Sequence, residues 1–453
     1  MKAKRNVIKI WLASSVLSTL NLQPSTAFAQ PVTKIAAGSG HSLFLKSDGS
    51  LWGMGFNGSG QLGNANYNSN RPELIVASNV TAIAAGAEHS LFLKSDGSLW
   101  GMGANYSGEL GDGTYTSTSS PEQIVASNVV AISAGGWFSL FIKSDNSLWG
   151  MGYNNDGELG DGTTSTTNRP EQIVASNVTA IASGFAHSLF LKNDGSLWGM
   201  GANTGYQLGD GTTNNINRPV QIAASNVTAL AAGNWDSLFL KSDGSLWGMG
   251  FGPAIGYGIC NYTNGPGQIV ASNVTAIGAG ASSYCLFLKS NGSLWGMGNN
   301  YDGQLGDDTT NYISQPEQIV PGNVTAIAAG ERFSLFLKSD GSLWGMGYNY
   351  DGELGDGTYS STNQPEQITA GFLPGYNLIC CQLLGSVKMQ LSFVGNAGWN
   401  YALDHSSSLS PPINWIPQAT NPAGSFGALV FTNLPNPTTN NFWRIRSVPR
   451  EFP

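Results

Sequence analysis

Short stretches of alternating apolar and polar residues, separated by turns, recur along most of the chain at a nearly constant spacing. The clearest marker is the segment Leu-Trp-Gly-Met-Gly, whose copies lie 48 or 49 residues apart and begin at Leu51, Leu99, Leu148, Leu197, Leu246, Leu294 and Leu343. Self-similarity with a period of this length is typical of propellers and solenoids. The repeat therefore predicts the fold class before any single residue is considered.

Each repeat predicts short strands joined by turns. In one copy the four strands, named a, b, c and d, are expected at residues 121–125, 129–134, 139–143 and 148–152. An Ala-Ser-Asn turn joins a to b, and a tight hairpin, Asp-Gly in most copies, joins c to d. A long Gly-, Asn- and Thr-rich connection follows d. Seven such repeats predict an all-β, seven-bladed propeller of four-stranded blades.

The ends of the repeat region predict how the ring closes. The first repeat starts at strand b, with residues 32–35. The last segment, residues 365–368, is a strand a, and no strands b, c and d of the repeat follow it. We therefore expect the N- and C-terminal strands to share one blade, which would protect otherwise exposed strand edges. The glycines of strand d further suggest that this strand lies at the crowded inner side of each blade.

The chain divides into three segments. Residues 1–29 combine a basic stretch, an apolar run and Ala27-Phe28-Ala29, a pattern typical of a cleaved export signal, with an anchoring or buried helix as the alternative. Residues 30–370 form the propeller, and residues 371–453, where the repeat stops, predict a small β-rich C-terminal module. We expect an exported protein (periplasmic, cell-surface or secreted) with no membrane span in the mature chain.

Charge narrows the choice of partners. Charged residues make up 11% of the chain, against about 25% in an average domain. Removal of residues 1–29 takes away four of the 20 basic residues and no acid, which leaves 16 basic against 28 acidic residues. An acidic chain without basic clusters argues against nucleic acid as a partner. We expect a monomer that binds an unidentified protein or a glycan.

The cysteines and the fifth repeat stand apart from the pattern. The four cysteines, Cys260, Cys285, Cys380 and Cys381, allow three pairings in an exported chain. A bridge between Cys260 and Cys285 and two free thiols are both open, because sequence does not supply the geometry. Just before Cys260, residues 252–259 replace the usual glycine pattern, so we expect a differently shaped connection there.

Several short motifs keep the same order from repeat to repeat. They are Ala-Gly-x-x-His-Ser, as at residues 85–90, the Asp-Gly hairpin, Trp-Gly, and Gly-x-Leu-Gly, as at residues 108–111. In these motifs the region of about residues 32–369 resembles the regulator of chromosome condensation family. The resemblance implies a seven-bladed propeller, but a fold of this kind does not by itself determine a function.

Strand direction sorts the connections into two groups. The b–c loops and the connections that leave strand d belong to one end, which we call the loop face, and the hairpins and Ala-Ser-Asn turns belong to the other. The Ala-Ser-Asn turns hardly change, whereas the loop-face connections differ and hold 13 of the 15 tyrosines in or beside them. Because Tyr and Trp give large contact areas at low entropy cost, we expect a binding surface, with relaxed drift of the loops as the alternative.

The candidate contact residues of this surface come from nearly all repeats. They are Glu88, Tyr106, Trp137, Phe138, Tyr153, Phe185, Tyr206, Trp235, Asp236, Tyr284, Tyr301, Glu331, Arg332, Phe333 and Tyr350.

No pattern predicts catalysis or a cofactor. His41, His89 and His187 occupy equivalent positions and could bind a metal, but hydrogen bonding at strand edges is the interpretation we favour. Residues 156–162 only faintly resemble a calcium loop, because they lack the alternating ligands and the final Glu. The sequence predicts no nucleophile elbow, no P-loop and no dinucleotide-binding unit. We expect no catalytic residue, no metal and no cofactor.

Three functions follow from these patterns. The first is an exported scaffold that binds a protein through its loop face; exported propellers that inhibit β-lactamases are similar in repeat pattern and engage their targets in this way. The second is a carbohydrate-binding module at the cell surface, since low charge and exposed aromatic rings also suit sugar stacking. The third, guanine-nucleotide exchange as in nuclear members of the family, agrees poorly with export and acidic charge.

Overall fold

A computed structural model describes residues 30–256 and 262–369, and six strands nearer the C-terminus. The expected export signal, residues 1–29, lies outside the described residues. The repeats form one compact unit, Pro31–Thr369. No helix in this described part of the chain is long and apolar enough to cross a membrane.

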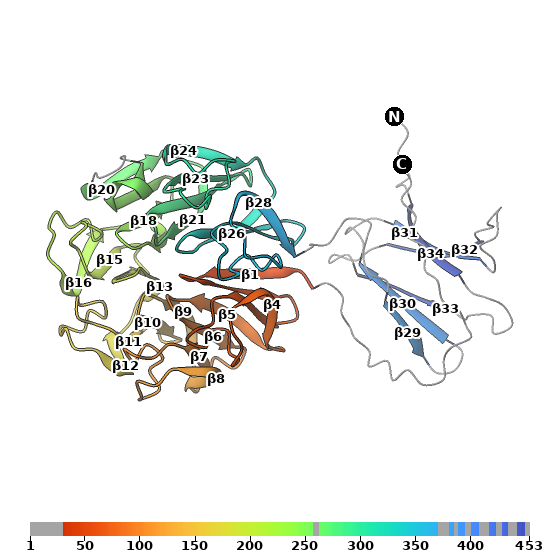
Figure 1. Cartoon of the computed structure of the whole chain (residues 1–453), viewed down its shortest axis with the longest axis horizontal. Helices are drawn as coiled ribbons and strands as arrows, with labels where there is room; N and C mark the ends of the chain where they lie inside the picture. Colours follow the sequence, from red (N-terminus) through yellow and green to blue (C-terminus); the bar gives the residue numbers. More distant parts are fainter. Residues whose placement is uncertain are drawn as a thin grey trace. The chain divides into compact units, whose positions relative to one another are not determined.

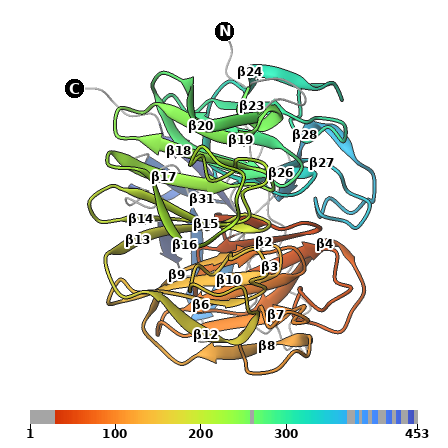
Figure 2. The same cartoon turned by 90° about the vertical axis from the view of Figure 1, so that its left-hand side faces the viewer.

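The repeats form seven antiparallel four-stranded sheets, which confirms the predicted propeller. Figures 1 and 2 show these blades in colour order, with the red first blade beside the blue last one. In the order b, c, d, a, the strands of blades 1 to 7 are β1 Val32–Ala37, β2 His41–Lys46, β3 Leu51–Gly55, β4 Ser69–Val76; β5 Val80–Ala85, β6 His89–Lys94, β7 Leu99–Gly103, β8 Thr118–Val125; β9 Val129–Ala134, β10 Phe138–Lys143, β11 Leu148–Gly152, β12 Thr167–Val174; β13 Val178–Ser183, β14 His187–Lys192, β15 Leu197–Gly201, β16 Ile216–Ala223; β17 Val227–Ala232, β18 Asp236–Lys241, β19 Leu246–Phe251, β20 Tyr262–Val270; β21 Val274–Gly280, β22 Tyr284–Lys289, β23 Leu294–Gly298, β24 Ile313–Val320; β25 Val324–Ala329, β26 Phe333–Lys338, β27 Leu343–Gly347 and β28 Thr362–Thr369.

Strand b, not strand d, is the innermost strand of each blade. The b strands contact one another around the ring, from β1 through β5, β9, β13, β17 and β21 to β25, which contacts β1 again. The expectation that strand d lies innermost is therefore wrong. Its glycines make room for side chains of their own blade: a Cβ on Gly53 would lie 2.8 Å from Ile75 and 3.0 Å from Leu62.

The expected closure of the ring within one shared blade is also wrong. Strand a pairs with the strand d that precedes it, as in Leu148↔Val174, so every blade consists of four consecutive strands. The Ala-Ser-Asn turn therefore joins two blades. Asn128 of this turn has a φ of 67°, and its carbonyl accepts a hydrogen bond from the Ser144 N–H at 2.8 Å. The ring closes where β1 packs on β25 and β26 (Figure 1).

The apolar core lies between neighbouring blades. Leu43 and Leu51 of blade 1 pack with Phe92 and Met102 of blade 2, and all four side chains are fully buried. Equivalent clusters lie at other junctions of the ring. Because burial of apolar surface is the main favourable term in folding, each blade depends on the next for its core.

A buried asparagine organises the long d–a connection. In blade 3, the Asn154 side-chain oxygen accepts a hydrogen bond from the Leu159 N–H at 2.9 Å, and its Nδ2 donates to Asp161 at 3.2 Å. The equivalent residues Asn57, Asn105, Asn203, Asn300 and Asn349 make the same two kinds of bond. Blade 5 has Gly252 at this position, and its connection starts with a 3-10 turn, η1 Gly252–Ile255. The different shape expected there is confirmed.

The C-terminal segment contains two three-stranded antiparallel sheets, ordered β29-β30-β33 and β32-β31-β34. Their strands are β29 Cys380–Leu384, β30 Lys388–Val394, β31 Asn400–Ser406, β32 Ile416–Pro422, β33 Ala428–Asn433 and β34 Phe442–Val448. Cys285, in the propeller, is a buried free thiol. Cys260 and the side chains of Cys380 and Cys381 lie outside the described part.

We predict that Asn154→Ala lowers the free energy of unfolding by about 1–3 kcal/mol, because the buried N–H of Leu159 loses its acceptor. Urea denaturation followed by tryptophan fluorescence measures this change. Asn155→Ala, at the exposed neighbouring position, is the control and should stay within about 0.5 kcal/mol of the parent. Equal losses in the two variants would contradict the role given to Asn154.

Candidate functional site

The loop face is held together by backbone hydrogen bonds within and between blades. Within blade 3, the Tyr153 N–H after strand d donates to the Trp137 carbonyl of the b–c loop at 2.9 Å. Between blades, the Gly136 N–H donates to the Phe185 carbonyl and the Phe185 N–H to the Gly233 carbonyl, both at 3.1 Å. These bonds confirm that the b–c loops and d–a connections gather at one end, and they join consecutive loops into a continuous base.

Glycine is required where the b–c loops of neighbouring blades meet. A Cβ on Gly86 would lie 2.6 Å from the Gly135 carbonyl oxygen and 2.4 Å from the His89 ring. The same close approach recurs at Gly38 and Gly184. A larger residue would push the loops apart, so the constant glycine positions the variable residue that follows it.

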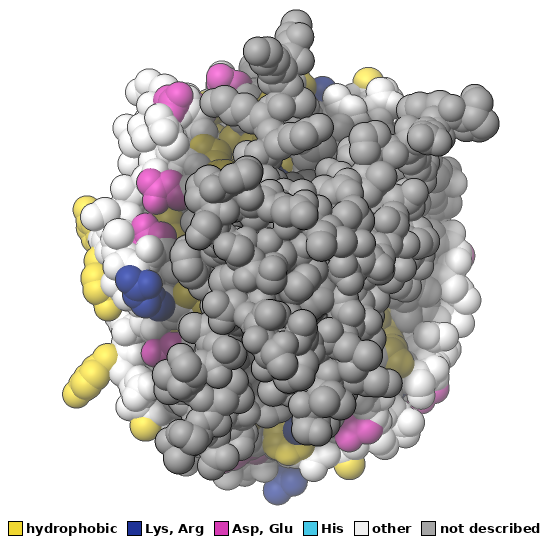
Figure 3. Space-filling model, turned by 90° about the vertical axis from the view of Figure 1, so that its right-hand side faces the viewer, with side chains coloured by type: hydrophobic (Ala, Val, Ile, Leu, Met, Phe, Trp, Pro, Cys, Tyr) yellow, Lys and Arg dark blue, Asp and Glu magenta, His cyan; other side chains and the backbone are white. Residues whose placement is uncertain are grey.

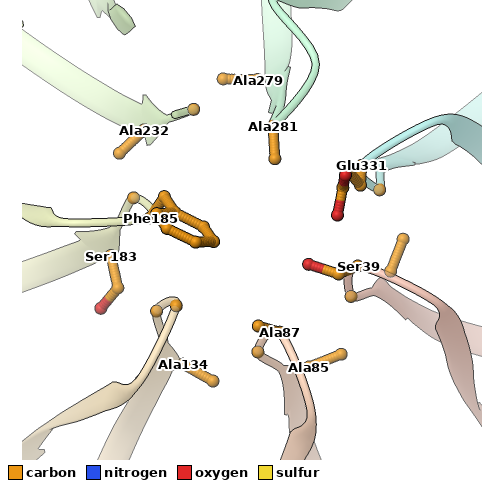
Figure 4. A pocket seen from close by; sticks show the side chains of 18 of the residues that line it. Ser39, Ala85, Ala87, Ala134, Ser183, Phe185, Ala232, Ala279, Ala281 and Glu331 are labelled. Atoms are coloured by element: carbon orange, nitrogen blue, oxygen red, sulfur yellow. The ribbon is translucent and has the colours of Figure 1, made fainter. Parts of the chain in front are cut away.

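These loops surround the mouth of a central channel, a cavity of about 120 Å³ lined mainly by Ala, Gly and Ser. Figure 4 shows Phe185 reaching toward the centre from one side, with Ser39 and Glu331 pointing inward from the other. The mouth is thus formed by small side chains, with one aromatic ring and one carboxylate directed into it.

Exposed aromatic rings lie beside this mouth on blades 3 to 5. Trp137 is 40% exposed, and its ring meets Phe185 at 4.7 Å and Tyr153 at 5.9 Å between centroids, both edge to face. We call these three residues the aromatic cluster. Trp235, 43% exposed, follows on the next b–c loop and lies against the Gly205 backbone. The cluster and Trp235 form an apolar area on a rigid base.

The other predicted contact residues that reach the surface are more dispersed. Tyr106, Tyr301 and Tyr350 are well exposed, while Glu88, Tyr206 and Glu331 are half-buried. Exposed Arg332 makes a bidentate ion pair with Asp302, at 2.7 and 2.9 Å.

The prediction is wrong for four of the contact residues, because Phe138, Asp236, Tyr284 and Phe333 are fully buried. Each is the first residue of a strand c and points between blades rather than into the loop. The loop ends one residue earlier than the sequence suggested. None of the four can touch a partner in this conformation.

The same position holds the three histidines, which join one blade to the next. His41 hydrogen bonds with Ser90 at 2.9 Å, His89 with Ser139 at 3.0 Å and His187 with Ser237 at 2.8 Å. Burial lowers the pKa of His41 and His187 to about 3, so these rings are neutral. Within the described residues, no group of three or more His, Cys, Asp or Glu side chains could hold a metal ion.

At the junction of blades 5 and 6 this bond is replaced by an unusual pair. Asp236 stands where other blades have His or an aromatic residue, and Cys285 stands where they have Ser. Neither Asp236 carboxylate oxygen has a hydrogen-bond partner among the described residues. Burial raises the pKa of Asp236 well above its ordinary value, so the neutral acid is favoured.

Buried carboxyl groups also lie in the d–a connections. Glu158 and Glu353 accept backbone hydrogen bonds through one oxygen, from Asp156 and Asp351 at 3.0 Å. Burial raises the pKa of both to about 7. In other blades Gln207 and Gln304 accept the same bond, so either a carboxyl or an amide oxygen serves at this position of the repeat.

Comparison with known proteins identifies the repeats. The sequence profile of the RCC1-like domain matches residues 14–281, more than half of the chain. Profiles of the regulator of chromosome condensation (RCC1) repeat match residues 291–337, and residues 274–304 and 324–353. No curated protein sequence matches the chain significantly.

Solved structures share the fold at low sequence identity. Human WBSCR16 has a TM-score of 0.63 at 22% identity, over 71% of this chain and 93% of that chain. Prp20p from Saccharomyces cerevisiae, in a structure described with its binding properties to Gsp1p and histones, has a TM-score of 0.63 at 20% identity, over 75% and 86%. Yeast RCC1 (Prp20) bound by Kap60 has a TM-score of 0.64 at 18% identity, over 81% and 91%.

We predict that replacing Glu158 and Glu353 by Gln makes stability less dependent on pH. Their folded pKa of about 7 lies above the unfolded value of about 4.3. The folded state therefore holds these protons more tightly, and stability falls as the pH rises through this window. In the parent protein this ionisation lowers the free energy of unfolding by roughly 1–3 kcal/mol per site at pH 8, and the double variant should avoid this loss. Urea midpoints of the parent and the double variant at pH 4.5 and 8 test this. An equal change of the midpoint between these pH values in both proteins would contradict the prediction.

We predict that Asp236→Asn raises the melting temperature at pH 7.5 and changes it much less at pH 4. The amide keeps the shape of the carboxyl group but removes the cost of ionising it without a partner. Differential scanning calorimetry gives the readout. Glu122→Gln, an acid-to-amide change at an exposed position of β8, is the control. A stabilisation of equal size at both pH values would show that ionisation of Asp236 is not its cause.

Proposed function

Since the chain belongs to the RCC1-like domain family, we propose that it is an exported, non-enzymatic scaffold that binds another protein through its loop face. The aromatic cluster on blades 3 and 4, continued by Trp235 on blade 5, is the observation that carries the proposal. Trp and Tyr dominate binding energy at protein interfaces when they stand in the middle of a contact area.

The rigidity of the base favours binding. The loops that carry Trp137, Phe185 and Trp235 are linked by the backbone bonds at Gly136 and Phe185, so little loop ordering has to accompany association. Edge-to-face contacts of Trp137 with Phe185 and Tyr153 hold an apolar ring in a defined orientation while it is partly exposed to solvent. A partner that covers these rings would gain apolar contact at low entropy cost.

Relatives of known structure support protein binding as the class of function. Binding to Gsp1p and histones is described for Prp20p, and Kap60 is bound to yeast RCC1. Their partners are not transferred to this chain at 18–20% identity. We further propose that it acts as a monomer and does not bind nucleic acid. Its acidic balance argues against nucleic acid, and the Lys and Arg side chains visible around the grey region of Figure 3 are scattered rather than gathered in one patch.

The test uses the purified protein as bait for surface and secreted proteins of its source, followed by calorimetry with each captured protein. We predict that Trp137→Ala weakens binding by about 30-fold, since truncating a central aromatic residue costs about 2 kcal/mol. Val130→Ala is the control, because Val130 is exposed near the opposite end of blade 3. Failure to capture any partner, or equal affinity of the parent and Trp137→Ala, would reject the proposal.

A further inference from the structure

A second concave site lies between the d–a connections of blades 6 and 7, apart from the aromatic cluster on blades 3 and 4. It has a volume of about 460 Å³, within the range of small-molecule sites. Tyr301, Asp302 and Thr310 line it from blade 6. Blade 7 contributes a larger set of lining residues, Tyr350, Asp356, Thr358, Ser360, Ser361, Thr362, Asn363 and Glu366. We call it the tyrosine groove.

The repeat itself shows what is special about this junction. The residue after the loop-organising asparagine is Tyr106, Tyr301 or Tyr350 in blades 2, 6 and 7, and Gly58, Asn155 or Thr204 in blades 1, 3 and 4. Blades 6 and 7 are neighbours, so two tyrosines at this position meet across one groove. Tyr301 is 66% exposed and Tyr350 65% exposed. Packing of the fold does not require exposed rings at this position, because blades 1, 3 and 4 form the same connection with Gly, Asn or Thr there.

The two walls of the tyrosine groove are fastened to each other. The Asp308 N–H donates to the Asn363 carbonyl at 3.0 Å, and the Asn363 side-chain amide donates back to the Asp308 carbonyl at 2.8 Å. Tyr350 is also braced by Tyr348, with ring centroids 4.8 Å apart. The two connections that carry Tyr301 and Tyr350 are therefore held together before any ligand arrives.

The tyrosine groove is lined by acidic but not by basic side chains. Asp302 accepts two hydrogen bonds from Arg332, its ion-pair partner. Asp356, whose two oxygens accept from the Thr358 hydroxyl at 3.0 and 2.8 Å, and exposed Glu366 keep their negative charge. No Lys or Arg lines the groove, and most of the other lining groups are hydroxyls. The surface is thus poorly suited to a phosphate, whereas its carboxylates and hydroxyls can accept hydrogen bonds from the hydroxyls of a ligand.

We propose that the tyrosine groove binds a neutral oligosaccharide. Sugar rings present apolar C–H faces, which fit the flat faces of Tyr301 and Tyr350, and hydroxyl edges, which need donors and acceptors such as Ser, Thr and Glu366. This proposal does not depend on protein binding by the aromatic cluster, because the two sites share no residue.

The test begins with a glycan array of neutral and acidic oligosaccharides probed with the full-length protein, followed by calorimetry with each neutral oligosaccharide that is retained. Hexalysine and polygalacturonate serve as charged probes. We expect a neutral oligosaccharide to bind, and Tyr301→Ala and Tyr350→Ala each to weaken it about tenfold or more, since each removes one of two stacking faces. Tyr106→Ala, which removes the equivalent ring in blade 2, and Trp137→Ala should change the affinity less than about twofold.

Three outcomes would overturn the proposal. They are retention of no neutral oligosaccharide by the parent protein, binding that is unchanged in both tyrosine variants, and binding of hexalysine or polygalacturonate alone. Melting temperatures of the variants separate loss of the site from loss of the fold. Since Trp137→Ala affects only the protein-binding proposal, failure of one proposal is distinguishable from failure of the other.

Discussion

The contact between one blade and the next is the constraint on which the rest of this structure depends. No blade encloses a core alone, because residues such as Leu43 and Phe92 are buried only across a junction. Most of these junctions are also bonded at the loop face between neighbouring b–c loops, and all of them are bonded at the opposite end beside the turns that join the blades. Hydrogen bonds therefore hold each blade at both ends. Residues at the loop tips, which do not take part in these bonds, can vary without loss of the fold.

Sequence periodicity was enough to predict the propeller, its blade count and the two groups of connections, because these depend on which positions recur. It could not tell which strands pair. Strand a lies three residues before one strand b and follows its own strand d only after a long connection, so proximity in sequence favoured the wrong partner. In six blades a buried asparagine such as Asn154 folds this connection back on its own blade. Blade 5 has η1 there instead, and β20 still pairs with β19.

The position of the loop face was predicted from the sequence, but several residues assigned to its surface are buried. His41, Phe138, Asp236 and Tyr284 occupy one position, and such a mixture looks like a variable loop. Their shared property is burial between blades, where a ring or a small polar group can fill the same space. The exposed tyrosines, in contrast, follow a constant asparagine. Alignment of all repeats on that asparagine would have placed Tyr301 and Tyr350 on neighbouring blades from the sequence alone.

Uniform repeats also make departures from the pattern meaningful. The junction of blades 5 and 6 has neither the ring-to-serine bond nor, among the described residues, a partner for Asp236. Blade 5 also has η1 in place of an asparagine-organised connection. Buried polar groups without partners cost stability, and a closed ring is held by every one of its junctions. The apolar contacts of this junction are nevertheless kept, because Leu238, Cys285 and Phe287 belong to one cluster and are fully buried. These contacts hold the two blades together in spite of the unpaired carboxyl group.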